Sequence, residues 1–505
     1  MCLSFSLYYS ILALLSNFLF VSTTIITATT TNNNNASSSA WNFESITRGL
    51  NLFPVNEANI VEKDPLAGKA LIVEKPFRFP FFYNDYETAN YDGASSVKAL
   101  GHYAGYYRLD QTKGARMFYY FFESRQIKTK DPVVVWLSGG PGCSSSLALF
   151  YENGPFYLTK NLSLVWNNYG WDKVANLIYI DQPTGTGFSY STNRDDIRNG
   201  SDEAAVDFYN FIQAFFKEHP KYASHDLYIT GESYAGHYIP AFAAQVHRGN
   251  KINDGRLHIN LKGIAIGNGL TNPGIQYKAY PDYALDMKLI NRTRYNELRR
   301  PVSTCQHLVN KNCLGTKSSS ACAQAFIYCN GIFGYIANSI GGKNYYDIRK
   351  QCKGNLCYDF SYMERFLAKP SVKKALGVDE DMEFVSCSDA VYDAMLGDWM
   401  LNFAVDIPEL LEDGIELLVY AGEYDLICNW LGNSRWVHDM NWSGQKDFLL
   451  ARNVTFKVDR LNAGLVKSHG PLTLLKMYNA GHMVPKDQPK PALEMLRKWT
   501  HGIPL

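Results

Sequence analysis

Six short, near-continuous apolar runs, each ending near Gly, Asp, Asn or Ser, recur along the chain after about residue 97. Because their apolar positions are nearly continuous rather than alternating, the runs predict strands buried on both faces, as in a parallel sheet. Segments with helical spacing of apolar residues lie between them, most clearly at 202–217. The pattern therefore predicts an α/β fold with a mostly parallel central sheet and helices on both faces. The predicted strands are 133–136, 177–180, 227–230, 261–266, 417–420 and 474–478.

A long gap separates the fourth and fifth predicted strands and contains seven of the ten cysteines, six of them clustered within 305–357. Residues 271–405 therefore predict a cap insertion held by its own disulfides, because a small subdomain cannot bury enough apolar surface alone. The core on either side comprises residues 97–270 and 406–505. Residues 23–96 begin Thr/Asn/Ser-rich and show no clear period, which predicts a disordered leader or propeptide followed by an N-terminal segment.

The N-terminus carries an apolar stretch at 5–21 followed by small residues, which predicts a signal peptide over residues 1–22. A membrane anchor is the alternative. The stretch is at the lower edge of spanning length, is interrupted by Ser10, Ser16 and Asn17, and has no basic flank. We therefore expect cleavage, no stable membrane association afterwards, and residence in the vacuole or outside the cell.

Sequons and cysteines fit the secretory pathway. Of six Asn-x-Ser/Thr sequons, one lies in the predicted leader. Loss of Cys2 with the signal peptide leaves nine cysteines, so at least one thiol stays free. Zinc would need a Cys-x2-Cys pair with a histidine doublet, which the sequence lacks, so disulfides are favoured and no metal or other cofactor is expected. The predicted glycosylation sites are Asn161, Asn199, Asn291, Asn441 and Asn453.

Composition narrows the possible partners. The chain has 49 Lys and Arg against 48 Asp and Glu, for a net charge of +1, and no run of five like charges. Nucleic acid and acidic membrane surfaces are therefore poor partners. With 46% hydrophobic and 19% charged residues, the chain can bury a sizeable core. The pattern assigns no oligomeric state.

The predicted strand 227–230 ends in Gly231-Glu232-Ser233-Tyr234-Ala235. This pattern is typical of a nucleophile elbow, in which small neighbours let a strand turn sharply into a helix and expose the serine hydroxyl. The last position of Gly-x-Ser-x-Gly is Ala235, so the match is strong but incomplete. An ordinary turn with a surface serine is the alternative.

Two later strand ends supply partners for Ser233. α/β hydrolases present their triad in the chain order serine, acid, histidine, each on the loop that leaves a strand. Asp425 follows the predicted strand 417–420, and His482 follows 474–478. We predict that His482 is the general base for Ser233, and that Asp425 orients the imidazole and stabilises its cation.

Other candidates fail this order test. Asp181 also leaves a predicted strand but precedes Ser233. His469 and His501 do not follow a buried strand through a glycine, and we interpret His237, on the helix after the elbow, as structural.

The sequence Ser-Gly-Gly-Pro-Gly-Cys-Ser-Ser (138–145) follows the first predicted strand. Its glycines have no side chain to block a carbonyl oxygen, so we predict an oxyanion hole made by the backbone N–H groups of Gly140 and Tyr234. A phosphate-binding loop is the alternative, but the Lys-Ser/Thr ending is missing.

Four motifs in this order resemble the serine carboxypeptidase family: the glycine loop 138–145, Gly-Glu-Ser-Tyr-Ala-Gly (231–236), the Asp425 loop and Asn-Ala-Gly-His-Met-Val-Pro (479–485). The similarity covers about 97–505, and the branch resembled most is the plant and yeast single-chain, carboxypeptidase Y-like type. It implies an α/β-hydrolase fold and release of C-terminal residues from peptides at acidic pH through an acyl-enzyme.

The resemblance also implies how a free C-terminal carboxylate is held, by Glu152, Glu232 and the Ser138-Gly139 segment. Two carboxyl groups beside a substrate carboxylate cannot all ionise, so shared protons donate hydrogen bonds to the anion at acidic pH. The family commonly has Asn where this chain has Ser138, whose hydroxyl also donates but reaches less far. From the residues alone, a solvated loop acid is the favoured interpretation of Glu152.

Met483 is implied to line the pocket for the departing residue, with a core methionine as the alternative. The odd thiol would be Cys428, lining the substrate cleft. Sequence alone leaves 15 pairings for the cluster of six cysteines. The disulfides implied by the resemblance are Cys143–Cys387, Cys305–Cys329, Cys313–Cys322 and Cys352–Cys357.

Two other functions stay open beside hydrolysis of peptides with a free C-terminal carboxylate. An acyltransferase using glucose-ester donors shares the triad chemistry until water or an alcohol resolves the intermediate. A catalytically inactive binding relative is the second, although no triad member is missing.

Overall fold

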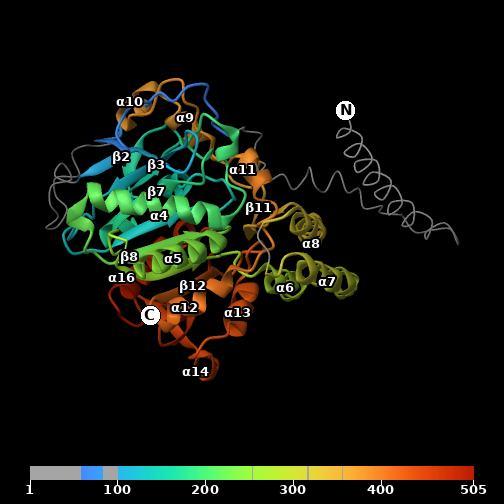
Figure 1. Ribbon diagram of the computed structural model, residues 1–505. Helices are drawn as coiled ribbons and strands as arrows, with labels where there is room; N and C mark the ends of the chain where they lie inside the picture. The colour runs from blue at the N-terminus through green and yellow to red at the C-terminus, as the bar shows by residue number, and fades with distance from the viewer. Residues whose placement is uncertain (1–57, 83–100, 253, 316–317, 355) are drawn as a thin grey trace, which may run out of the picture. The chain divides into compact units, whose positions relative to one another are not determined.

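A mixed 11-stranded sheet forms the centre of the part that the structure describes (Figure 1). This computed structural model describes residues 58–82, 101–252, 254–315, 318–354 and 356–505. The predicted signal peptide (1–22) and much of the predicted leader and N-terminal segment (23–57 and 83–96) lie outside the described residues. Within the described ranges, no helix combines the length and apolar character needed to cross a bilayer.

The six predicted strands are neighbours in this sheet and run parallel to one another. All residues of the strands at 133–137, 176–181 and 227–232 are buried, as near-continuous apolar runs require. The predicted fold class is therefore confirmed. In sheet order the six strands are β7 (Asn176–Asp181), β4 (Val133–Leu137), β8 (Leu227–Glu232), β9 (Leu261–Gly267), β12 (Glu416–Gly422) and β15 (Leu472–Met477).

Antiparallel strands that the apolar runs did not predict extend both edges of the sheet. β1 (Ile72–Pro76), β2 (His102–Arg108) and β3 (Arg116–Phe122) continue it beyond β7. β14 (Leu461–His469) and β13 (Val454–Val458) continue it beyond β15. The last two mix exposed and buried positions, so their sequences contain no long apolar run. Because β1 belongs to the sheet, residues 58–82 of the predicted N-terminal segment are part of the core.

Helices cover the sheet on both faces. The predicted helix 202–217 is α4 (Ser201–Glu218), which packs with α5 (Ala235–Asn250) in front of the strands in Figure 1. The ring of Tyr119 on β3 lies 5.0 Å from that of Phe211 on α4. The next residue on β3, Tyr120, turns to the other face and meets Phe79, which packs against Phe150 of α3 (Ser146–Tyr151). Alternate aromatic residues of one strand thus join both helical layers.

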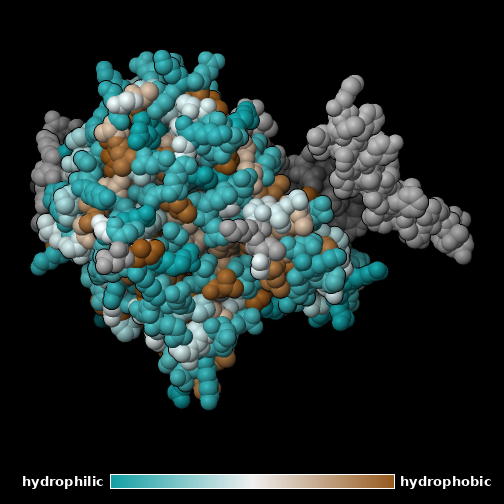
Figure 2. Space-filling view, in the orientation of Figure 1, coloured by the Kyte–Doolittle hydropathy of each residue, from teal (hydrophilic) through white to brown (hydrophobic). Residues whose placement is uncertain are grey.

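The remaining segments are short. They are β5 (Phe156–Leu158), β6 (Leu164–Trp166), η3 (Trp171–Lys173), η4 (Arg194–Asp196), η5 (Pro220–Tyr222), α12 (Ile407–Glu412), α13 (Trp430–Asp439), α14 (Gln445–Leu450), α15 (Val484–Asp487) and α16 (Pro489–Thr500). Figure 2 shows that hydrophilic residues dominate the face in view and that hydrophobic residues reach it only in small groups.

The segment predicted as the cap insertion, 271–405, lies between β9 and β12, and none of its described residues belongs to the central sheet. Three of its helices group together beside the sheet (Figure 1). Its elements are α6 (Pro273–Asp286), α7 (Arg292–Asn312), α8 (Ser320–Ser339), β10 (Lys343–Asn344), β11 (Asp347–Gln351), α9 (Ser361–Leu367), α10 (Pro370–Leu376), α11 (Asp389–Ala394) and η6 (Phe403–Asp406).

The structure pairs the cysteines as the resemblance implied. Cys305–Cys329 and Cys313–Cys322 fasten α7 to α8, Cys352–Cys357 closes the chain after β11, and Cys143–Cys387 joins the glycine loop to the cap insertion. Among the described cysteines, Cys428 has no disulfide and is buried.

The Cys143–Cys387 bridge closes a far longer loop than Cys313–Cys322, with sequence separations of 244 and 9. Chain entropy therefore predicts that replacing both cysteines by serine reduces the free energy of unfolding by about 5 kcal/mol for the first bridge and about 3 kcal/mol for the second. Urea unfolding followed by tryptophan fluorescence measures both. An equal or larger loss for the Cys313–Cys322 variant would contradict this ranking.

Candidate active site

Ser233 lies on a sharp turn between β8 and α5, in the left-handed region with φ +63°. The turn is tight because Gly231 packs against β4: a Cβ on Gly231 would lie 2.1 Å from the Leu137 carbonyl oxygen. That same Cβ would approach the Ala235 methyl to 3.1 Å, so Ala235 fits because Gly231 has no side chain. The sequence thus produces the strained strand-to-helix turn that lifts a serine hydroxyl clear of the backbone.

Asp425 and His482 lie side by side because their strands do. Gly422 pairs with Met477 at the ends of the adjacent parallel strands β12 and β15, so the loops after them leave the same edge of the sheet. His482 Nδ1 is 2.8 Å from Asp425 Oδ2, and both side chains are buried. Ser233 and His482 line one cavity. This arrangement fits a general base whose tautomer is fixed by a carboxylate.

Asn268, which the sequence analysis missed, holds the Asp425 carboxylate from the other side. Its amide Nδ2 donates to Asp425 Oδ2 at 2.8 Å, while its Oδ1 accepts from the Gly422 N–H at 3.0 Å. The backbone N–H groups of Ile427 and Cys428 donate to the same carboxylate at 3.1 and 3.2 Å. Asn268 follows β9 directly, so its position after a buried strand was the signal that could have found it.

The glycine loop packs directly against the elbow. A Cβ on Gly139 would lie 2.4 Å from the Tyr234 nitrogen and 2.7 Å from the Ser233 Cβ, so only glycine fits there. Gly140, at φ +114°, lines the same cavity as Ser233 and Tyr234. The predicted oxyanion donors therefore come from two segments that touch beside the nucleophile.

The rival residues have other contacts. Buried Asp181 accepts from Ser144 Oγ at 2.5 Å and from the Phe188 N–H at 2.9 Å. His237 is buried with its ring nitrogens at the Leu270 and Trp399 carbonyls, and burial lowers its pKa to about 4. His469 and His501 are not buried.

Two buried glutamates form a pair, of which Glu232 lines the same cavity. Glu152 directly follows α3 and Glu232 ends β8, and the two carboxyl groups interact strongly enough that each shifts the pKa of the other. They are only 2% and 6% exposed. Burial raises the pKa of Glu152, and burial together with the Glu152 charge raises the pKa of Glu232 well above its usual value. The pair therefore retains a proton where an isolated glutamate would lose it.

Lys486 is a cation near this pair that the sequence analysis did not single out. Its ammonium lies 4.6 Å from the centre of the Tyr358 ring and 5.3 Å from that of Tyr151. Burial lowers the pKa of Lys486, while the charges of Glu152 and Glu232 act in the opposite direction. The positive charge of Lys486 in turn lowers the pKa values of Glu152 and Glu232 and so favours their ionised forms.

Side chains from the core and from the cap insertion enclose the cavity. Ser138, Cys428 and Met483 line it, as the resemblance implied, together with Glu232. The Ser138 Oγ accepts from the Trp136 indole at 3.3 Å, so its own hydrogen stays available to a ligand. The cap insertion adds an apolar wall whose aromatic members are Tyr277, Tyr280, Phe333, Tyr346, Tyr358, Phe360, Tyr392 and Trp399.

Comparisons with known proteins find relatives over most of the chain. A family model described as serine carboxypeptidase matches residues 93–502. Serine carboxypeptidase-like 48 of Arabidopsis thaliana is 58% identical over 91% of this chain and 89% of its own length. Serine carboxypeptidase 3 of Hordeum vulgare is 61% identical over 80% of this chain and 79% of its own length. Among solved structures, a prohormone-processing carboxypeptidase from Saccharomyces cerevisiae gives a TM-score of 0.74 at 25% identity, covering 85% of this chain and 95% of that one.

Replacing Asn268 by Asp turns the amide that donates to Asp425 into a second carboxyl group. A hydrogen bond to a charged group is worth about 1.5–3 kcal/mol, so we expect the rate of Ser233 labelling by diisopropyl fluorophosphate to fall about 10- to 100-fold. Asn250→Asp is the matched control, because Asn250 also makes two hydrogen bonds, to Ile259, but at the far end of α5. Equal labelling rates in both variants would contradict the role of Asn268.

Proposed function

The chain belongs to the serine carboxypeptidase family, and we propose that it releases C-terminal residues from peptides at acidic pH through an acyl-enzyme on Ser233. One observation carries this proposal beyond the family: Glu232 lines the cavity of the nucleophile and interacts there with a second buried carboxyl group, that of Glu152. A serine–histidine–aspartate arrangement alone suits any acyl transfer. The glutamate pair additionally supports recognition of a free C-terminal carboxylate and activity at acidic pH.

In the proposed mechanism, His482 accepts the Ser233 proton at Nε2 while Asp425 fixes the Nδ1–H tautomer. The Ser233 oxygen attacks the scissile carbonyl, and the N–H groups of Gly140 and Tyr234 stabilise the resulting oxyanion. His482 then protonates the leaving amine, which departs as the free C-terminal amino acid. Water, activated by the same imidazole, hydrolyses the acyl-enzyme and restores Ser233.

Glu152 and Glu232 would hold the substrate carboxylate through the proton they share, with Ser138 and Gly139 completing the site. The sign of the pH dependence follows from the raised pKa values. Glu152 loses its proton as the pH rises through its pKa, about 7, whereas Glu232, whose pKa burial and the Glu152 charge raise well above its usual value, keeps the shared one. Above this pH the pair has fewer protons to donate to the substrate anion and more negative charge beside it. Substrate binding should therefore weaken towards neutral pH.

The side chain of the departing residue would pack against Met483 and the aromatic wall of the cap insertion, which favours bulky apolar residues. Cys428 would line the cleft without acting as a nucleophile. Burial raises the pKa of this thiol well above its usual value, so it stays protonated at acidic pH.

Passage through the secretory pathway to the vacuole or the extracellular space is part of the proposal. Disulfides persist in oxidising compartments, and the described residues form four. A glycan needs an accessible asparagine, and the five predicted sites, Asn161, Asn199, Asn291, Asn441 and Asn453, are all exposed.

The nucleophile is tested by Ser233→Ala. Without the hydroxyl no acyl-enzyme forms, so we expect the release of C-terminal residues from a blocked dipeptide to fall by at least about 10⁴-fold. Ser468→Ala, which removes an exposed hydroxyl on β14, is the control and should keep full activity. Mass spectrometry of the released amino acids gives the rate; turnover that survives in Ser233→Ala would point to another nucleophile.

Glu232→Gln tests carboxylate recognition. An amide donates a hydrogen bond at every pH, so KM for a free-carboxylate peptide should rise less between pH 5 and 8 than in the unmodified enzyme. The same peptide with a C-terminal amide is the control substrate, and its KM should be high and unaffected by the substitution. An equal rise in KM for both substrates in Glu232→Gln would contradict the role of Glu232 in binding the carboxylate. Equal KM values for the two peptides in the unmodified enzyme would favour an esterase or acyltransferase.

A further inference from the structure

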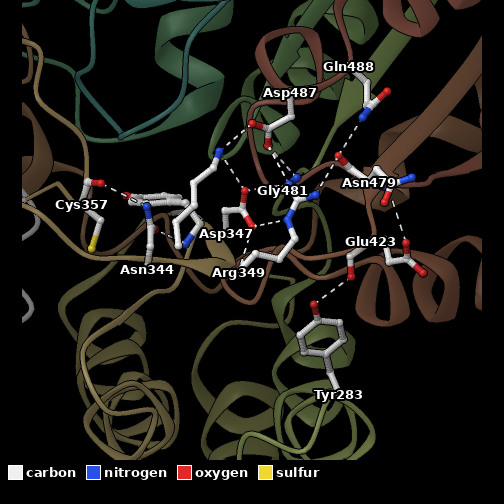
Figure 3. Close-up of polar contacts among 12 residues, drawn as sticks. Tyr283, Asn344, Asp347, Arg349, Cys357, Glu423, Asn479, Gly481, Asp487 and Gln488 are labelled. Atoms are coloured by element: carbon white, nitrogen blue, oxygen red, sulfur yellow. Dashed lines mark hydrogen bonds and ion pairs between the residues drawn. The ribbon is translucent and has the colours of Figure 1, made fainter.

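The β10–β11 hairpin of the cap insertion lies against both loops that carry the predicted base and its acid partner (Figure 3). Three charged residues of β11, Asp347, Arg349 and Lys350, face these loops, and we call them the β11 clamp. No motif in the sequence marks them.

An ion cluster built on a buried carboxylate forms the clamp. Arg349 donates to both oxygens of Asp347 at 2.8 Å, and Lys350 lies 2.9 Å from the same carboxylate. The Asp347 side chain is 0% exposed. Burial raises its pKa, but the hydrogen bonds from Arg349 and Lys350 outweigh this effect and lower it below the usual value. Asp347 thus stays ionised under the acidic conditions of the proposed reaction.

The clamp reaches the loop of His482 at several points. Arg349 donates to the Asn479 carbonyl at 3.1 Å, and Lys350 pairs with Asp487 at 2.8 Å. Asp487 in turn accepts from the Gly481 N–H at 2.8 Å. The backbone takes part as well, because the His482 N–H donates to the Tyr346 carbonyl, just before Asp347, at 2.7 Å.

The hairpin also holds the loop of Asp425. The Ile348 N–H donates to the Tyr424 carbonyl at 3.1 Å, and the Arg349 guanidinium lies 4.6 Å from the centre of the Tyr424 ring. On the other side of Asp425 in the chain, the Leu426 N–H donates to the Tyr345 carbonyl at 3.0 Å. The residues on both sides of Asp425 are therefore fixed to β11 and the turn before it.

Close packing leaves these segments little freedom. A Cβ on Gly481 would lie 2.5 Å from the Tyr346 carbonyl oxygen and 2.8 Å from the Asp347 Cβ. A Cβ on Gly422 would lie 1.9 Å from the Gly481 carbonyl oxygen. A displacement of β11 would therefore move the His482 loop with it.

We propose that Asp347, Arg349 and Lys350 are positioning residues that hold the His482 and Asp425 loops at their working separation, so that the cap insertion sets the activity of the triad. The inference rests on the proposed function, since it assigns the residues a task only if His482 and Asp425 act on Ser233. Misplacing a catalytic group by about 1 Å can reduce a rate about 100-fold, whereas surface ion pairs add little stability.

Arg349→Met tests the proposal without removing the buried charge partner, because Lys350 still pairs with Asp347. We expect kcat to fall about 10-fold on both a free-carboxylate peptide and an ester substrate, with KM changed less than about 2-fold. Labelling of Ser233 by diisopropyl fluorophosphate should slow by the same factor while reaching full stoichiometry. Arg349→Lys keeps the charge but not the two parallel hydrogen bonds, so it should recover part of kcat.

The matched control is Arg497→Met on α16, which also removes a two-point arginine–carboxylate pair, to Glu494, with similar exposure of the arginine. It should leave kcat unchanged. An unchanged kcat in Arg349→Met would overturn the proposal, because the clamp would then have no effect on catalysis. A lower final fraction of labelled Ser233 at an unchanged labelling rate would also overturn it, because the clamp would then be needed only for folding.

A double-substitution cycle separates this inference from the proposed function. If Arg349 acts through the Asp425–His482 pair, adding Arg349→Met to Asp425→Asn should reduce kcat less than it does alone. Fully multiplicative effects would overturn the positioning role while leaving the proposed function intact. Failure of the proposed function is detected independently, as full activity in Ser233→Ala.

Discussion

The adjacency of two parallel strands, β12 and β15, is the constraint on which the rest of this site depends. Parallel strands end at the same edge of a sheet, so the loops after them meet, and Asp425 comes to lie 2.8 Å from His482. Both groups are buried, and a buried carboxylate needs hydrogen-bond donors. The imidazole, the Asn268 amide and two backbone N–H groups supply them. The elbow of Ser233 and the glycine loop then only have to reach the same edge, which β8 and β4 ensure.

The carboxyl groups around the cavity are in opposite environments. Asp425 accepts hydrogen bonds from the Asn268 amide and two backbone N–H groups and lies beside the His482 imidazole, whereas Glu152 and Glu232 are buried against each other and keep a proton. Different surroundings suit nearby acids to different roles, and those we propose here are orientation of a base by Asp425 and recognition of a substrate anion by the glutamate pair. Lys486 opposes the proton retention of the pair and so limits it.

The cap insertion covers the site and also forms part of it. It provides the aromatic wall, is joined to the glycine loop by Cys143–Cys387, and contacts both catalytic loops through β11. In our proposal one segment both lines the pocket and positions the triad, which would link the choice of substrate to the rate of reaction. Changes in the insertion are therefore expected to alter both.

Continuous apolar runs determined the six parallel strands, and the order of the polar residues after them determined Ser233, Asp425 and His482 as candidates, because both signals are local in the chain. The resemblance supplied the cysteine pairing that spacing left open. The antiparallel strands at the sheet edges, Asn268, Lys486 and the β11 clamp were decided only by the tertiary structure. Each depends on contacts between segments far apart in sequence: Asn268 meets Asp425 across 157 positions, and Arg349 meets Asn479 across 130. A charged or amide side chain on a loop looks the same in sequence whether it faces water or a catalytic loop, and only the packing of the insertion onto the core separates the two.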